Sequence, residues 1–331
     1  LAAERLSFGS DRARRLALGS VDVSVPLSHE VATERPWALR IPYFGVNVYE
    51  EKEDPRKHFT IRNIVQLPAE AFVEGPRAKA KSAQRFAGQG LLFIHGYNTS
   101  FDNAIYRAAQ IAFDLKFDGP VFVYSWPSGG GLASYTYDRE SSQQSEPYLR
   151  RFIEQAAQLV GPSRLSVIAH SMGAQPLLRV LRDLQGAPSR STTGSSAPIE
   201  LDQLILAAPD FDRDSFEDVM GLIKGAARGI TLYVSSTDRD LQDVRRFSGG
   251  VPRAGDIPAD GPLVLPGVDT IDVSETSTAA LGLQHSGYAE KGALLDDIGV
   301  LVRTGARPDI RTPALKKVET PKGVFWRYAV Q

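Results

Sequence analysis

The chain has 331 residues, 42% of them hydrophobic, with 38 basic and 39 acidic side chains. This length suits one large α/β domain with excursions, or two smaller domains. A formal net charge of -1 gives no electrostatic footprint for nucleic acid, and no stretch is long and apolar enough to cross a bilayer. The absence of cysteine excludes disulfides, thiolate catalysis and zinc–cysteine sites.

The first 89 residues are rich in predicted strands. Three segments carry β-branched and aromatic residues with partial alternation: 21–25 (VDVSV), 39–49 (LRIPYFGVNVY) and 57–67 (KHFTIRNIVQL). Clusters of proline, glycine and charged residues separate them, as in 50–57. We predict that these segments form antiparallel strands at one side of a sheet.

From Gly90 onward, strands alternate with helices. Short apolar runs predict buried parallel strands at 91–94, 121–126, 165–169, 203–208, 230–235 and 268–273. Apolar residues at helical spacing predict helices near 100–115, 147–160, 172–184 and 288–302, with a short helix after 208. This alternation predicts a doubly wound, mostly parallel sheet with helices on both faces.

Three segments interrupt the alternation, and we expect them to be irregular: 127–146, 185–198 and 248–267. The last of them is long enough to rim a pocket. We expect a single domain over 1–331, made of a strand-rich part (1–89), a catalytic core (90–303) and a tail (304–331). The tail could add a strand or dock on the core.

The stretch AHSMG (169–173) places a serine between a predicted strand and a predicted helix. A nucleophile elbow usually reads G-x-S-x-G, because the sharp turn needs small residues two before and two after the serine. Ala169 and Gly173 satisfy this rule, and the helix amides would favour negative charge on the serine oxygen. The context predicts Ser171 as a nucleophile, and a purely structural turn is the alternative.

A serine nucleophile needs a base, and the chain has five histidines. His285 lies between the last predicted strand of the alternating region and the last helix, where this topology would deliver a base to Ser171. The other four suit solvated, packing or supporting roles better: His29, His58, His95 and His170.

Two strand ends could supply the acid that orients the histidine. Asp238 follows the second strand after the serine, and Asp240 is its local competitor. Asp210 follows the first strand and could instead cap the next helix. The chain order serine, acid, histidine admits both strand ends, and Asp238 is preferred because the acid normally follows the later strand.

Backbone amides are expected to bind the oxyanion. One belongs to Met172, and the other to Tyr97 in the loop HGYN (95–98). Gly96 would let the backbone approach the substrate, with His95 and Asn98 supporting the loop. An aromatic acyl pocket could use side chains near the strand ends, although packing explains each of them equally well: Trp126, Tyr135, Tyr137 and Phe211.

Other chemistries find no support in the sequence. It contains neither a G-x-x-x-x-G-K-[ST] loop nor an H-E-x-x-H motif. The acidic run 210–218 resembles the start of a calcium loop, but Gly221 stands where such a loop needs its final glutamate. We expect no metal and no organic cofactor.

Several segments together resemble a bacterial esterase/lipase-like branch of the α/β-hydrolase superfamily, whose function is unknown. The resemblance covers about residues 6–303 and rests on 7–29, 91–128, 167–181, 207–216, 233–241 and 284–288. It implies the α/β-hydrolase fold, a triad of Ser171, Asp238 and His285, and oxyanion donors at Tyr97 and Met172. Ala169 departs from the commoner glycine.

The expected function is therefore a serine hydrolase that cleaves small-molecule or lipid carboxylic esters through an acyl-enzyme. The alternatives are an acyltransferase or peptidase with the same triad, or a non-catalytic binding protein of hydrolase fold. The resemblance and a first residue other than Met favour an exported or envelope-attached bacterial protein, with a cytoplasmic one as the alternative. Nothing in the sequence indicates an oligomeric state.

Overall fold

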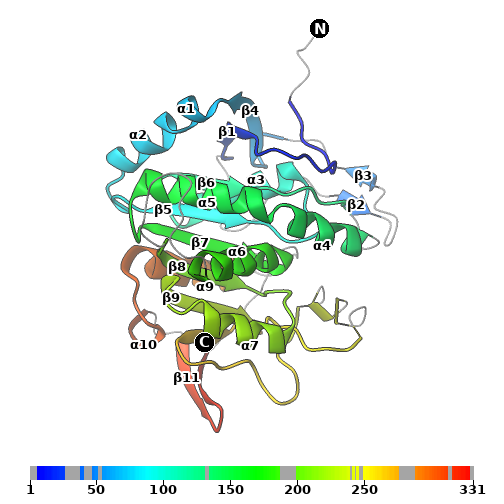
Figure 1. Ribbon diagram of the computed structural model, residues 1–331, viewed down its shortest axis with the longest axis vertical. Coiled ribbons are helices and arrows are strands. Elements are labelled where there is room, and N and C mark those ends of the chain that lie inside the picture. Colours follow the sequence, from blue (N-terminus) through cyan, green and yellow to red (C-terminus); the bar gives the residue numbers. More distant parts are fainter. Residues whose placement is uncertain are drawn as a thin grey trace.

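The computed structural model describes residues 6–26, 38–40, 47–50, 54–130, 134–186, 199–238, 241–242, 244–245, 249–275, 288–311 and 315–328. Its main sheet has eight strands in the order β11-β12-β10-β9-β8-β7-β5-β6 (Figure 1). The strands are β5 (Gly90–Ile94), β6 (Val121–Tyr124), β7 (Leu165–His170), β8 (Leu201–Ala207), β9 (Ala227–Val234), β10 (Val268–Asp272), β11 (Leu315–Thr320) and β12 (Gly323–Tyr328). Only β11 runs antiparallel to its neighbour, so the predicted mostly parallel sheet is confirmed.

Helices cover both faces of this sheet (Figure 1). One face carries α5 (Glu146–Val160), α6 (Ala174–Gly186) and α7 (Arg213–Leu222); the other carries α3 (Phe101–Asp114) and α9 (Tyr288–Thr304). Successive side chains of a strand point to opposite faces, so Val167 and Ala169 of β7 join the first core while Ile168 joins the second. Burial on both faces explains why these strands read as continuous apolar runs.

The N-terminal strands form small sheets of their own and do not extend the main one. β1 (Leu18–Ser24) pairs antiparallel with β4 (Thr60–Leu67), and β2 (Ala38–Arg40) pairs with β3 (Asn47–Glu50). Phe59 and Ile61 pack against Ile105 and Tyr106 of α3. The β1–β4 pair therefore covers a helix, which leaves one of its faces toward solvent.

Two helices in the N-terminal part were not predicted: α1 (Ala69–Phe72) and α2 (Glu74–Ser82). None of the α2 side chains is buried. A helix that buries no side chain has no apolar periodicity from which to predict it.

The segment 127–146, predicted to be irregular, contains a helix, α4 (Tyr135–Gln144). The prediction was wrong because the buried side chains of α4 are polar: Asp138, Ser141 and Ser142. A search for apolar residues at helical spacing cannot find such a face.

The C-terminal tail belongs to the main sheet. After α10 (Pro308–Arg311), β12 pairs in parallel with β10, and β11 forms the outer edge opposite β6 (Figure 1). Arg311 forms a fully buried ion pair of 2.7 Å with Asp297 of α9. Asp297 also accepts a 2.6 Å hydrogen bond from the hydroxyl of Tyr233 in β9, so the tail is joined to both helix and sheet.

None of the helices in the described part of the chain has the length and apolar character required to cross a bilayer.

Candidate functional site

Ser171 lies at a sharp turn between β7 and α6. The strand ends at His170, residues Ser171–Gly173 form a single 3₁₀ turn, and α6 begins at Ala174. Ser171 has φ 49°, in the left-handed region that costs a non-glycine residue about 1–2 kcal/mol. The residue is buried, with 7% of its surface exposed. Strain of this kind persists only where the surrounding structure enforces it.

The small residues around Ser171 fit tightly. A Cβ added to Gly173 would collide with the carbonyl oxygen of His95, so a larger residue there would push the elbow off the preceding loop. Ala169 lies inside β7, between Ile94 of β5 and Leu206 of β8. Its methyl group is fully buried in the apolar core, which explains why alanine is accommodated at this position.

The loop HGYN lies directly against the elbow. A Cβ added to Gly96 would stand 3.0 Å from the Cβ of Ser171 and 3.0 Å from Nδ1 of His170. Any larger residue would be crowded against these atoms, so glycine suits this close approach. The structure thus brings the predicted oxyanion loop and the predicted nucleophile together.

His95 anchors the start of this loop. Its Nδ1 donates to the carbonyl of Gly96 over 2.7 Å, and its Nε2 accepts from the amide of Trp126 over 3.1 Å. The Trp126 ring stacks on the imidazole at 4.7 Å and donates through Nε1 to the carbonyl of His95. Desolvation lowers the pKa of His95 to about 4, so the ring is neutral with its proton on Nδ1.

Asn98 ends the loop in a left-handed conformation, with φ 53°. Its amide donates to the carboxylate of Asp138 over 2.9 Å. Asp138 was missed in the sequence, because it lies on the polar helix α4, forty residues away from the loop it contacts.

The two candidate acids differ sharply. Asp238 follows β9, is partly exposed, and accepts from the amide of Leu241 over 3.1 Å. Asp210 follows β8 and is fully buried; its oxygens accept from the Tyr135 hydroxyl over 2.8 Å and from Nε of Arg253 over 2.7 Å. The local competitor at 240 lies outside the described residues.

His285 also lies outside the described residues, in the connection between β10 and α9. Among the other histidines, desolvation together with the charge of Arg107 lowers the pKa of His170 to about 3, so its ring is neutral. His58 accepts through Nδ1 from the amide of Asp54 over 3.0 Å. His29 is not among the described residues.

The four predicted pocket aromatics occupy different surroundings. Trp126 and Phe211 are buried in the apolar core, 2% and 6% exposed. Tyr135 stands edge-on to Tyr97 at 5.6 Å between ring centroids. The hydroxyl of Tyr137 donates to the carbonyl of residue 10 in the N-terminal segment. Of the four, two contact the HGYN loop: Trp126 through His95, and Tyr135 through Tyr97.

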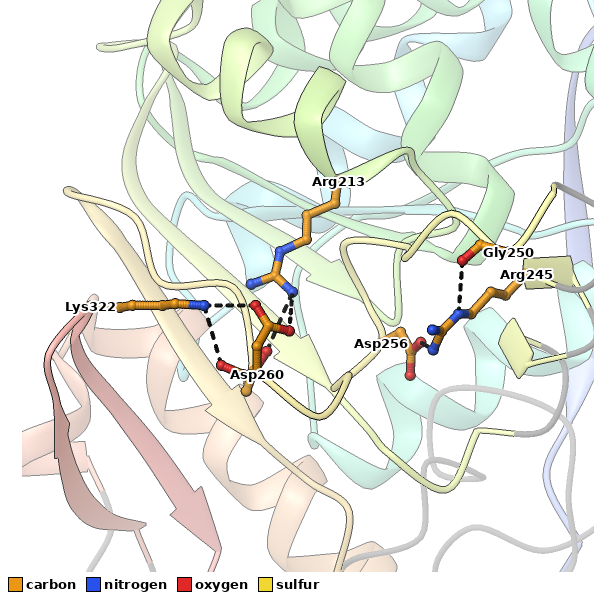
Figure 2. A network of polar contacts seen from close by, with 7 residues as sticks. Arg213, Arg245, Gly250, Asp256, Asp260 and Lys322 are labelled. Carbon is orange, nitrogen blue, oxygen red and sulfur yellow. Dashed lines mark hydrogen bonds and ion pairs between the residues drawn. The ribbon is translucent and has the colours of Figure 1, made fainter.

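The long connection 249–267 carries Arg253, which sequence reasoning missed because an irregular segment offers no periodic signal. Two further sets of ion pairs hold this connection (Figure 2). Arg245 binds Asp256 over 3.2 Å, while Asp260 contacts Lys322 of the β11–β12 turn over 2.7 Å and Arg213 of α7 over 3.6 Å. The connection is therefore attached to the buried Asp210, to α7 and to the tail.

No group of three or more histidine, aspartate or glutamate side chains able to hold a metal ion occurs among the residues that the structure describes.

A family model described as "Alpha/beta hydrolase of unknown function (DUF900)" matches residues 79–303, well over half of the chain. The chain belongs to this family. The alpha/beta hydrolase fold suggests hydrolase activity, and membership of the family leaves the reaction open.

Further comparisons add little to this. No curated protein matches the chain. One similar solved structure is that of the ydeN gene product from B. subtilis, 15% identical, with 52% of this chain and 87% of that chain covered and a TM-score of 0.31.

Proposed function

We propose that the protein is a serine hydrolase that cleaves carboxylic esters through an acyl-enzyme. The observation that carries this proposal is the conformation of Ser171, a left-handed serine between a buried strand and a helix, packed against the glycine of the HGYN loop. This is the arrangement of a nucleophile elbow beside an oxyanion loop.

In the proposed reaction, Oγ of Ser171 attacks the ester carbonyl while His285 takes its proton. Asp238 holds the imidazole in the required tautomer and stabilises the imidazolium. The amides of Tyr97 and Met172 bind the oxyanion. His285 then protonates the leaving alcohol and activates a water molecule, which releases the acid and restores Ser171.

The assignment of His285 as the base is supported by the state of the two histidines near Ser171. An efficient general base has a pKa near the working pH. Burial depresses the pKa of His95 to about 4 and that of His170 to about 3, which makes both poor proton acceptors. Both rings suit supporting roles, as neutral hydrogen-bonding or packing groups.

Asp238 is preferred to Asp210 because of the contacts that Asp210 already makes. The guanidinium of Arg253 already neutralises Asp210, whose second oxygen accepts from Tyr135. To turn toward an imidazole, this carboxylate would have to break its ion pair with Arg253 or its hydrogen bond from Tyr135. Asp238 is partly exposed, at the end of the next strand along the sheet.

A fluorophosphonate probe tests the nucleophile. We expect the intact protein to be labelled and to hydrolyse p-nitrophenyl esters, and Ser171→Ala to lose both properties. Ser163→Ala is a matched control, because Ser163 is another left-handed serine, at φ 52°, in an exposed turn before β7. Absence of labelling in the intact protein, or equal labelling of Ser171→Ala, would overturn the proposal.

The same experiment separates the alternatives. A non-catalytic binding protein would show neither labelling nor turnover. An acyltransferase or a peptidase would be labelled, but would favour an added alcohol acceptor or an amide substrate over the ester. A series of p-nitrophenyl esters of increasing acyl length then measures the size of the acyl site, whose wall we propose to include Tyr135.

A further inference from the structure

The carboxylate of Asp138 is fully enclosed beside the HGYN loop. Its residue is 0% exposed. Oδ1 accepts from the amide of Gly129 over 2.6 Å, and Oδ2 accepts from the Ser128 hydroxyl over 2.6 Å and from the amide of Asn98 over 2.9 Å. A buried carboxylate is retained only when donors of this kind compensate its lost hydration.

The contacts of Asp138 help to hold the peptide group between Tyr97 and Asn98 in place. The peptide between Tyr97 and Asn98 donates its N–H to Asp138, and its carbonyl accepts from the Thr99 hydroxyl over 3.0 Å. The amide of Thr99 donates in turn to Ser128 over 3.1 Å. Both ends of the Tyr97–Asn98 peptide plane are thus held, and Asn98 is kept at its positive φ.

The other side of the loop is fixed independently by His95 and by the close approach of Gly96 to Ser171. The amide of Tyr97 therefore lies between two parts of the loop that are held in place, Gly96 and the Tyr97–Asn98 peptide. An oxyanion donor is effective only when its direction is set before the reaction begins.

We propose that Asp138 is a positioning residue for the ester hydrolysis, holding the Tyr97–Asn98 peptide so that the Tyr97 amide is directed at the oxyanion beside Ser171. This inference rests on the proposed function.

The N-terminal segment holds the helix that carries Asp138. Nε of Arg12 donates to the Ser141 hydroxyl over 2.8 Å, and its Nη2 donates to the carbonyl of Tyr137 over 3.0 Å. The guanidinium also lies over the Tyr137 ring, 4.3 Å from its centroid. Burial raises the pKa of Asp138, whereas its three donors and the charge of Arg12 act in the opposite direction.

The chain offers a matched control at the other end of the sheet. Asp118, which precedes β6, accepts from three backbone amides over 2.7, 2.8 and 2.9 Å, those of Gln84, Arg85 and Phe86. These residues lie near the amino ends of β5 and β6, whereas the HGYN loop follows the carboxyl end of β5. Asp118→Asn and Asp138→Asn therefore each change a carboxylate that accepts from three donors, and only Asp138 contacts the loop. Asp118 is half-buried, whereas Asp138 is fully buried.

Two measurements on the full chain test the proposal: amide hydrogen exchange of the segment 95–99, and kcat and KM for a p-nitrophenyl ester. For Asp138→Asn we expect faster exchange in this segment, a kcat lower by about 10- to 100-fold and a KM within about twofold of the wild type. Asp118→Asn should keep both the exchange of 95–99 and kcat.

Thr99→Val serves as a milder variant in case Asp138→Asn does not fold. It frees the other end of the same peptide, and should lower kcat by about three- to tenfold without changing KM. Unchanged exchange of 95–99 in Asp138→Asn, or unchanged kcat with faster exchange, would overturn the proposal. The same holds if Thr99→Val is fully active and Asp138→Asn is unfolded.

Failure of the proposed function gives a different result. A wild-type protein without labelling or turnover would remove the esterase. Hydrogen exchange would still decide whether Asp138 fixes the loop, because that measurement needs no substrate.

Discussion

Two regions at the carboxyl edge of the sheet differ in how they accommodate ionisable side chains. Around β5 and β7, the histidines His95 and His170 are kept neutral by burial, beside backbone groups with strained or glycine-dependent conformations. Around β8 and β9, charges are kept and partnered: Asp210 with Arg253, and Asp256 with Arg245.

This difference has a chemical meaning if Ser171 reacts as proposed. A developing oxyanion is best stabilised by amide dipoles whose direction is fixed before the reaction. The region of β5 and β7 fixes the HGYN loop through the neutral imidazole of His95 and the buried carboxylate of Asp138. The carboxylate proposed for the triad, Asp238, belongs to the second region, where Asp210 is already bound by Arg253.

The largest expected effect tests the second region. Asp238→Asn should lower kcat by about 10³- to 10⁴-fold with little change in KM, because an amide favours the wrong imidazole tautomer. Steady-state kinetics with a p-nitrophenyl ester measure this loss.

Asp210→Asn is the paired variant. It should fold less stably but keep kcat within about tenfold, since Asp210 is assigned to the framework of the site. Loss of turnover in Asp210→Asn together with full activity in Asp238→Asn would reverse the assignment of the acid.

A smaller effect concerns the stability of the second region. Asp210→Ala leaves the guanidinium of Arg253 buried without its partner, and should lower the free energy of unfolding by about 3–5 kcal/mol. Urea denaturation measures this change.

The control for this variant is an ion pair on the surface. Asp183 pairs with Arg182, and both side chains are about half exposed, 55% and 44%. Asp183→Ala should cause no measurable loss of stability. An equally small change in Asp210→Ala would show that the Asp210–Arg253 pair does not stabilise the connection 249–267.

The two regions were also unequally predictable from the sequence. The buried strands and the elbow follow from local signals: continuous apolar runs, a serine with small neighbours, and a helical pattern after it. The fold and the hydrolase family were therefore predicted correctly. Helix α4 was missed because its buried side chains are polar.

The partners of the candidate residues could not be predicted. Asp138 meets Asn98, and Arg253 meets Asp210, only after the chain has folded, across separations of forty and forty-three residues. No spacing rule connects such pairs. The triad residues and the division into one domain stay predictions, with His285 outside the described residues.

The smallest expected effect tests the first region through its pH dependence. The pKa of His95 is about 4 in the folded protein, against 6.5 for an unperturbed histidine. Between pH 4 and pH 6.5 the imidazole of His95 is mostly protonated in the unfolded chain and mostly neutral in the folded protein. Stability should therefore fall as the pH is lowered from 6.5 toward 4, by about 1.4 kcal/mol per pH unit for this residue.

Glutamine does not titrate, so His95→Gln abolishes this difference in proton binding between the folded and the unfolded state. Urea denaturation at pH 7 and pH 5 should show a difference in stability that is smaller by about 2 kcal/mol in His95→Gln than in the wild type. The pKa of His170 is depressed mainly by desolvation and the charge of Arg107, which His95→Gln leaves in place, so some acid sensitivity remains. An identical difference in the two proteins would mean that His95 takes up its proton as readily in the folded state as in the unfolded chain. The region of β5 and β7 would then not hold its imidazole neutral, and the contrast between the two regions would be lost.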